Sequence, residues 1–264
     1  MRIATWNVNS VVARLPRLLA WLADRRPDIV CLQETKSSAA GFPNADVEEL
    51  GYEIAVHGDG RWNGVAVLSR VGLDDVQAGF PGDPGFPTSD VLEPRAIAAT
   101  CGGVRVWSVY VPNGREPGHE HYTYKLAWLD ALRQAVASDA AGPRPFALLG
   151  DFNVAPTDDD VWDVAAFRNA THVTPPERAA LSALRDLGLR DVVPRPGKYD
   201  RPFTYWDYRA GMFHKNLGMR IDLVYANARF ADAVTDAFVD REARKGTGAS
   251  DHAPVVVELS VSEP

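Results

Sequence analysis

Phe146-Ala-Leu-Leu-Gly-Asp-Phe-Asn153 is an apolar run that ends abruptly in a glycine, a carboxylate and an amide. A short apolar run bounded by turn residues is typical of a strand buried on both faces. We therefore predict a strand over residues 145–150, with Asp151 and Asn153 at its end. In α/β folds, the rim formed by strand ends is where binding and catalytic groups gather.

Strand and helix patterns alternate along the rest of the chain. Apolar runs or alternations predict strands, and apolar residues at helical spacing predict helices. Gly102-Gly103 marks a hairpin turn between two of the strands. The combination indicates a layered α/β domain, in one sheet or two. The expected strands are 2–6, 28–33, 64–70, 95–101, 104–111, 145–150, 219–226, 234–241 and 254–261, and the expected helices are 12–26, 119–137 and 176–187.

Composition narrows the class of protein. The 264 residues fit one large domain or two small ones, and no apolar run approaches the ~20 residues of a membrane span. Two cysteines, Cys31 and Cys101, exclude a disulfide framework or a cysteine-rich zinc module. The N-terminus has no apolar signal segment, so we expect a cytoplasmic protein without membrane attachment.

The net charge of −7 argues against a generally basic nucleic-acid coat. Residues 194–220 differ from the rest of the chain, because they contain six cations and two carboxylates and so have a local net charge of +4. This segment is either a basic groove or a solvated loop with incidental charge.

Polar residues interrupt or end most of the expected strands. Any one of them has an ordinary interpretation as a turn or cap residue, but their recurrence favours one common site. They are Asn7, Gln33-Glu34, Tyr110, Asn113, Asp151, Asn153, Asp222 and Ser250-Asp251-His252.

The chemistry of this set is coherent. Its oxygen ligands are Asn7, Glu34, Asp151, Asn153 and Asp251, with no thiol and one histidine, which favours Mg²⁺ or Mn²⁺ over zinc. Carboxylates packed together also need a cation to offset their repulsion. A metal that polarises a polyanionic substrate suggests hydrolysis of a phosphodiester or phosphomonoester. By contrast, His119 and His121 are two positions apart and do not share a helix face.

With these residues in hand, the chain resembles the exodeoxyribonuclease III branch of the endonuclease/exonuclease/phosphatase superfamily. The motifs that carry the resemblance span residues 5–252. They are Thr5-Trp6-Asn7-Val8-Asn9, Leu32-Gln33-Glu34-Thr35-Lys36, Tyr110-Val111-Pro112-Asn113-Gly114, Gly150-Asp151-Phe152-Asn153, Trp206-x-Tyr208, Asn216-x-Gly218-x-Arg220-Ile221-Asp222 and Ser250-Asp251-His252.

The resemblance implies a four-layer α/β sandwich in which two packed mixed sheets are flanked by helices, as in deoxyribonuclease I, with residues 1–264 forming a single domain. It implies an Mg²⁺-dependent enzyme, with Mn²⁺ as a substitute, that acts on double-stranded DNA carrying abasic sites or 3′-blocked ends. The reaction implied is hydrolysis of the phosphodiester 5′ to an abasic site, leaving a 3′-hydroxyl, together with 3′→5′ exonuclease and 3′-phosphatase activity. We expect a monomer.

The resemblance also implies roles for the polar residues. Glu34 binds the metal with Asn7 and Asp251 nearby, and Asp151, helped by Asn153, deprotonates the attacking water. His252, held by Asp222, donates to a phosphate oxygen; the alternative makes His252 the base and Asp222 its orienting group. The sequence leaves both assignments open. The remaining catalytic or substrate contacts implied are those of Tyr110 and Asn113 with the scissile phosphate.

DNA contacts are implied for the basic segment. The resemblance places the lesion pocket and wedge at Tyr205, Trp206, Met219 and Ile221, with Arg220 in the same segment. The alternative for Tyr205 and Trp206 is an ordinary place in the core. Arg95, which enters a strand, is a further expected phosphate contact.

Two other functions remain as alternatives. One is a superfamily member of another substrate class, such as a sphingomyelin or inositol-phosphate phosphodiesterase, against which Trp206-Asp-Tyr208, the 216–222 motif and the missing signal segment count. The other is a non-catalytic scaffold, which has no need of the complete acid–base set.

Overall fold

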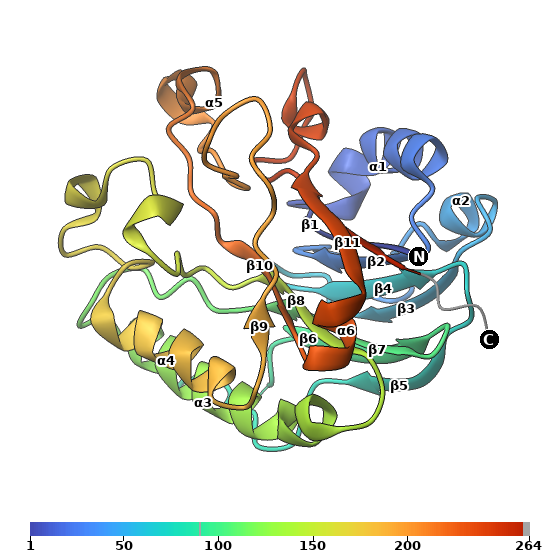
Figure 1. The fold of residues 1–264 in the computed structure, drawn as a ribbon, viewed down its shortest axis with the longest axis horizontal. Helices are drawn as coiled ribbons and strands as arrows, with labels where there is room; N and C mark the ends of the chain where they lie inside the picture. Colours follow the sequence, from blue (N-terminus) through green and yellow to red (C-terminus); the bar gives the residue numbers. More distant parts are fainter. Residues whose placement is uncertain (90, 261–264) are drawn as a thin grey trace.

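Two six-stranded sheets pack face to face in the computed structural model, which describes residues 1–89 and 91–260 (Figure 1). In spatial order, the first sheet consists of β11 (Val234–Val239), β12 (Val255–Leu259), β1 (Arg2–Asn7), β2 (Ile29–Gln33), β4 (Val65–Ser69) and β3 (Glu53–His57). The second consists of β5 (Asp74–Ala78), β6 (Ala96–Cys101), β7 (Val104–Tyr110), β8 (Phe146–Asp151), β10 (Asp222–Ala226) and β9 (Arg190–Asp191).

Helices cover the outer face of each sheet. Those beside the first sheet are α1 (Val11–Arg25) and α2 (Asn44–Glu48), whereas α3 (Glu120–Ala141) and α4 (Pro175–Arg185) cover the second (Figure 1). Two short helices, α5 (Met212–Lys215) and α6 (Ala228–Ala233), lie in connections. The expected four-layer sandwich is therefore confirmed. No helix within residues 1–89 and 91–260 has the length and apolar character to cross a membrane.

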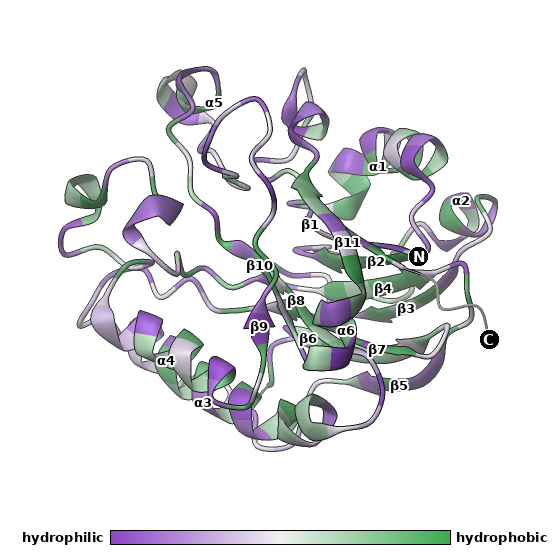
Figure 2. Cartoon of the chain, in the orientation of Figure 1, coloured by the Kyte–Doolittle hydropathy of each residue, from purple (hydrophilic) through white to green (hydrophobic). Residues whose placement is uncertain are grey.

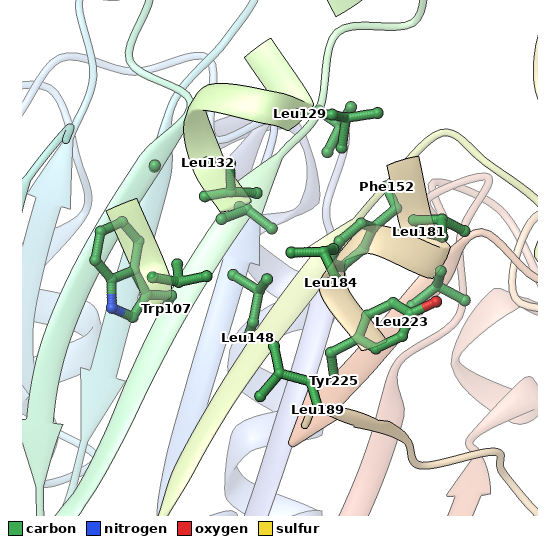
Figure 3. Packing of buried hydrophobic residues seen from close by; sticks show 14 of the residues in the cluster. Trp107, Leu129, Leu132, Leu148, Phe152, Leu181, Leu184, Leu189, Leu223 and Tyr225 are labelled. Carbon is green, nitrogen blue, oxygen red and sulfur yellow. The ribbon is translucent and has the colours of Figure 1, made fainter. Parts of the chain in front are cut away.

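Three apolar cores hold the layers together. Ile3, Cys31, Val106 and Leu149 belong to the core between the sheets, and separate cores join each sheet to its helices. The strands are accordingly the most hydrophobic segments, while the outer helix faces are polar (Figure 2). Figure 3 shows the core outside the second sheet, where strand side chains meet those of α3 and α4: Leu148, Leu223 and Tyr225 against Leu129, Leu181 and Leu184.

Strand β7 illustrates why both faces of a central strand must be apolar. Val104 and Val106 point into the core between the sheets, whereas Trp107 and Val109 point toward α3. Truncating a fully buried side chain of this kind costs about 2–5 kcal/mol. Successive residues of β7 therefore pack into two different cores, one on each face of the sheet.

The structure also contains elements that the sequence did not predict. Strand β5 is mostly exposed, and β9 has only two residues, so neither produces an apolar pattern. The expected strand 219–226 begins only at Asp222, because Met219 pairs with Tyr205 in an isolated bridge instead. Helix α3 continues to Ala141, four residues beyond its predicted end.

Two parallel strand pairs determine where the polar strand ends meet. In the first sheet β1 runs parallel to β2 and pairs Asn7 with Gln33, and in the second β7 runs parallel to β8 and pairs Tyr110 with Asp151. Strand β10 runs antiparallel to β8, so its first residue, Asp222, pairs with Asp151. These pairings place the polar ends of five strands along one edge.

Gly150 allows β8 to reach this edge. Its φ of +151° is rarely adopted by other residues, and a Cβ there would overlap the carbonyl oxygen of Val109 on the neighbouring strand. The glycine that precedes Asp151 is thus required by the close approach of two backbones.

Candidate active site

One amide joins the two sheets at the site. The Nδ2 of Asn7, at the end of β1, donates to Glu34 Oε1 at 2.8 Å and to Asp151 Oδ2 at 2.9 Å. Glu34 follows β2 with a φ of +49°, and Asp151 is the last residue of β8. Both carboxylates are thereby held side by side.

An imidazole completes the cluster from the opposite direction. His252 Nδ1 lies 2.8 Å from Asp222 Oδ2, and its Nε2 lies 3.8 Å from Asp151 Oδ2. All three side chains are buried. Burial alone would lower the pKa of His252, but Asp222 and Asp151 outweigh it and raise that pKa to about 10. The ring is therefore an imidazolium at neutral pH.

The two carboxylates of the cluster have opposite pKa shifts. Burial, with the neighbouring charges of Asp222 and Glu34, raises the pKa of Asp151 to about 7 despite the opposing effect of His252. Burial also tends to raise the pKa of Glu34, yet the hydrogen bond from Asn7 and the charge of Lys36 leave it below its usual value. Asp151 is thus the carboxylate able to accept a proton near neutral pH.

A divalent cation fits this arrangement. Ligand atoms of Glu34, Asp151 and His252 lie within 4.8 Å of one another, and the buried Oδ1 of Asp222 has no partner among the described residues. With His252 protonated, the ligand atoms left in this cluster are carboxylate oxygens, the donors that Mg²⁺ and Mn²⁺ prefer. The acids also outnumber the cations, and a bound metal would offset this excess.

Two predicted metal ligands, Asn7 and Asn153, use their amides in hydrogen bonds within the chain. The amide oxygen of Asn7 accepts the backbone N–H of Asn9, and the amide oxygen of Asn153 accepts from Asn113. Each oxygen thus accepts one hydrogen bond and keeps a second lone pair. Asn7 and Asn153 hold neighbouring groups in position, and their role as metal ligands stays a prediction.

Asp251 lies beside the cluster, and two further residues connect it to Glu34. Asp251 Oδ1 accepts from the Nδ2 of Asn9 at 3.1 Å. Lys36 Nζ then donates to Asn9 Oδ1 at 2.6 Å and lies 3.0 Å from Glu34 Oε2. Asn9 and Lys36 were not predicted as site residues, although each stands two positions after one that was.

Tyr110 and Asn113 occupy the side of the site formed by the second sheet. Burial, and then the nearby Glu34, raises the pKa of Tyr110, which keeps its hydroxyl protonated as a donor. Asn113 is exposed, and its Nδ2 donates to Asn153 Oδ1 at 3.1 Å. Both predicted phosphate contacts thus lie beside the cluster.

Three of the predicted DNA contacts are interior residues. Arg95 is buried, pairs with Glu93 at 2.6 Å and stacks on Tyr110. Arg220 is buried between Asp160 and Asp191, and Trp206 packs into a small core with Phe203 and Phe213. Each of these side chains is paired or packed inside the protein, and a contact of the three residues with DNA stays a prediction.

The other pocket residues lie close to His252. The ring centroid of Tyr205 is 4.9 Å from that of His252, and both residues are linked by an isolated bridge. Met219 and Ile221 are buried in a neighbouring cluster with Tyr205 packed against it. Tyr205 is thus the one aromatic of the predicted set that borders the catalytic groups.

The basic segment 194–220 is largely neutralised by folding. Besides Arg220, Arg195 pairs with Asp236, Arg201 with Asp159 and Arg209 with Asp207. The local charge of +4 therefore overstates the positive potential of this surface. His119 caps α3 and His121 stacks on Phe86, so neither is held toward a metal.

Comparisons with known proteins identify the family. The model of the Endonuclease/Exonuclease/phosphatase family matches residues 4–252. The chain belongs to this family. It is 30% identical to exodeoxyribonuclease III of Haemophilus influenzae, over 98% of this chain and 100% of that protein.

Solved structures agree with this assignment. The 3′-5′ exonuclease NExo of Neisseria meningitidis is 39% identical, with a TM-score of 0.93 over 99% of this chain and 100% of that one. An AP endonuclease of Archaeoglobus fulgidus is 34% identical, with a TM-score of 0.92 over 99% and 100% of the two chains.

Proposed function

We propose that this member of the family is a DNA-repair nuclease that hydrolyses the phosphodiester 5′ to abasic sites in duplex DNA, leaving a 3′-hydroxyl. We include 3′→5′ exonuclease and 3′-phosphatase activity, because a phosphomonoester at a 3′ end presents the same phosphorus and oxygen atoms to the site. The observation that carries the proposal is the buried row of side chains in which His252 lies between Asp222 and Asp151, with Glu34 beside Asp151. Relatives named as nucleases and AP endonucleases support it.

The proposed chemistry follows from the protonation of two side chains, Asp151 as a carboxylate that can accept a proton and His252 as an imidazolium. Asp151 accepts a proton from water as the water oxygen attacks phosphorus and the bond from phosphorus to the 3′ oxygen breaks. The 3′ oxygen leaves with the bonding electron pair and takes a proton from solvent water to become the 3′-hydroxyl. His252, held as an imidazolium by Asp222, donates a hydrogen bond to a phosphate oxygen and stabilises the added negative charge. The Tyr110 hydroxyl and Asn113 amide donate from the other side.

A divalent metal belongs to this chemistry, and we propose Mg²⁺, with Mn²⁺ as a substitute. Glu34 would hold it, and the further ligands that we propose are Asn7, Asp151, Asn153 and Asp251, of which Asp151 lies in the same cluster as Glu34. When bound, the metal polarises the phosphate and offsets the charge of the substrate. The amide of Asn7 donates to both Glu34 and Asp151 and so holds the two carboxylates at a fixed separation.

Incision of a defined lesion tests this function. A 5′-labelled duplex with one tetrahydrofuran abasic analogue is incubated with the protein and Mg²⁺. We expect a single cut product from lesion incision, and shorter ladder products where exonuclease activity follows. Glu34→Ala and His252→Ala should each abolish cleavage while the variants remain folded. Absence of cleavage with every divalent cation would reject the proposal.

The pH dependence of the rate tests which residue is the base. If His252 were the base with Asp222 as its orienting group, Asp222→Asn would shift the acidic limb of the pH–rate profile. The position of the wild-type limb separates the two assignments, because a His252 base places it near pH 10 and an Asp151 base places it near pH 7. With Asp151 as the base, we expect Asp222→Asn to lower the rate and to move the limb below pH 7, since the charge of Asp222 helps to raise the pKa of Asp151.

We also propose that residues 1–264 act as a single domain and as a monomer in the cytoplasm. Support comes from the site itself, whose residues come from both sheets, and from Cys31 and Cys101, which are free and buried as expected in a reducing compartment. The proposed partner is double-stranded DNA with abasic sites or 3′-blocked ends.

A further inference from the structure

Three arginines are buried in the described chain, and one of them lacks a carboxylate. Arg95 pairs with Glu93, and Arg220 pairs with Asp160 and Asp191. Arg244 is 7% exposed, and no carboxylate of residues 1–89 and 91–260 lies within ion-pair distance of it. The partners of its charge are instead aromatic, with the guanidinium carbon 4.9 Å from the ring centroid of Tyr208. A buried cation without a counter-charge is costly, so this exception indicates a place for an anion.

Arg241 lies beside Arg244 and is half-buried. It likewise has no carboxylate of the described residues within ion-pair distance. Its guanidinium carbon is 3.9 Å from the ring centroid of Phe213, and that of Arg244 is 5.0 Å from the same centroid. Each donates one hydrogen bond to the backbone, Arg241 to the oxygen of Phe213 and Arg244 to that of Trp206. The buried Nε of both has no acceptor among the described residues, so protein groups use few of their donors.

These two guanidinium groups line a cavity of about 570 Å³, within the usual size of ligand sites. Aromatic rings of Tyr199 and Tyr208 share the lining, with further cations at Lys198 and Lys245. The one lining carboxylate, Asp207, is bound to Arg209. The cavity therefore combines positive charge with flat apolar faces, as sites for stacked nucleotides do.

The cavity lies next to the active site. Tyr208, which lines it, has its hydroxyl 3.5 Å from the Nδ2 of Asn9, and the same nitrogen contacts Asp251 at 3.1 Å. In Figure 1, α5 and the orange-red turn before β12 rise from the same end of the sandwich. Successive nucleotides of a strand rise ~3.4 Å, so a strand held at the cluster can place a neighbouring nucleotide here.

We propose that the cavity between α5 and residues 241–247 binds one nucleotide unit, with its phosphate at Arg241 and Arg244 and its base against Tyr199 or Tyr208. The inference rests on the proposed DNA-directed function for the source of that nucleotide, which is either a flanking unit of the bound strand or a free mononucleotide product. The shared chemistry is a phosphate attached to a planar base.

Binding measurements without catalysis test the site. Arg241→Gln/Arg244→Gln is compared with wild type and with Arg133→Gln, which removes an exposed, Asp130-paired arginine on α3. Affinity for a labelled abasic duplex is measured in EDTA at several salt concentrations, and dAMP binding is measured by calorimetry. Urea unfolding verifies the fold, and Arg241→Lys/Arg244→Lys provides a second variant that keeps both charges.

For a strand nucleotide, we expect the glutamine variant to bind DNA about tenfold more weakly, with a shallower salt dependence by about one phosphate contact. The lysine variant should keep the salt dependence, and Arg133→Gln should match wild type. For a free nucleotide, dAMP binding should disappear in the glutamine variant and persist in Glu34→Gln, with DNA affinity unchanged.

The proposal is overturned if the glutamine variant matches wild type for both DNA and dAMP. It is also overturned if Arg133→Gln weakens DNA binding equally, because the effect then reflects net charge alone. A failure of the proposed function is distinguishable, because wild type would then neither bind nor cleave the duplex, whereas dAMP binding would still report on the cavity.

Discussion

Two buried clusters of charged residues lie on either side of Asn153, and they differ in charge balance. On one side, Lys125 Nζ lies 2.5 Å from Glu177 Oε1 and also donates to the carbonyl oxygen of Asn153, with both charged side chains fully buried. On the other, the N–H of Asn153 donates to Asp151 Oδ1 within the acid-rich cluster.

The difference separates a structural cluster from a functional one. Lys125 and Glu177 neutralise each other, and Thr171 and two backbone carbonyls satisfy the remaining donors. The cluster around Asp151 keeps an excess of carboxylates and an unpartnered oxygen on Asp222. Buried charge that the protein does not balance is suited to a cation and a substrate phosphate.

The largest expected effect breaks the functional cluster. Asp151→Asn should lower the single-turnover rate of abasic-site incision about 10³–10⁴-fold, because the base is lost and one charged ligand is removed. Its free energy of unfolding should stay the same or rise, since one of several repelling carboxylates is gone. Rates within tenfold of wild type would contradict the assignment.

The next effect breaks the structural cluster. Glu177→Gln should lower the free energy of unfolding by about 3–5 kcal/mol, because it leaves Lys125 buried without a counter-charge. Urea unfolding measures this change. The rate per folded molecule should remain near that of wild type, and Lys125→Met/Glu177→Leu should recover much of the lost stability. Equal losses in the single and double variants would show that the pair is not coupled.

Acid should weaken the structural cluster. Burial, with the charge of Lys125, lowers the pKa of His172 to about 4, and Lys125 lowers that of Glu177 to about 2 against the effect of burial. Both folded-state pKa values are depressed, so the unfolded chain binds more protons as pH falls. The His172 contribution is present above about pH 6.5 and is lost toward pH 4, and the Glu177 contribution is lost from about pH 4.5 toward pH 2.

We therefore expect the free energy of unfolding to fall by about 2–3 kcal/mol between pH 6.5 and 4 because of His172. Urea unfolding at pH 7.5, 5.5 and 4.5 measures it. His172→Gln should flatten this part of the profile while leaving the loss below pH 4.5. Asp151, whose pKa is raised to about 7, has the opposite effect on stability over this interval, so the comparison with His172→Gln isolates the histidine. A wild-type minus His172→Gln difference that stays constant between pH 7.5 and 4.5 would contradict the depressed pKa of His172.

The comparison also explains which features the sequence could predict. Asp151, Asp222 and His252 stand where apolar runs end, so their position in a strand predicted that they would meet. Lys125 and Glu177 stand on helices among ordinary surface charges, and only the packing of α3 against α4 buries them. No local pattern marks such a pair.

The burial of two predicted DNA contacts has a similar cause. Arg95 and Arg220 are cations in a motif or a basic segment, but their carboxylate partners Glu93, Asp160 and Asp191 decide their environment. Two of those partners lie 29 and 60 residues from Arg220. The sequence also could not predict the order of the strands in the second sheet. Its two outer strands, β5 and β9, carry too few buried residues to be recognised as strands.

Metal binding compares the two clusters most directly. Titration with Mn²⁺, followed by the electron paramagnetic resonance signal of the free ion, should show saturable binding to wild type and to Glu177→Gln, and its loss in Glu34→Gln. Equal binding by Glu34→Gln and wild type, or no binding by either, would contradict the claim that the strand ends of the two sheets form one cation site.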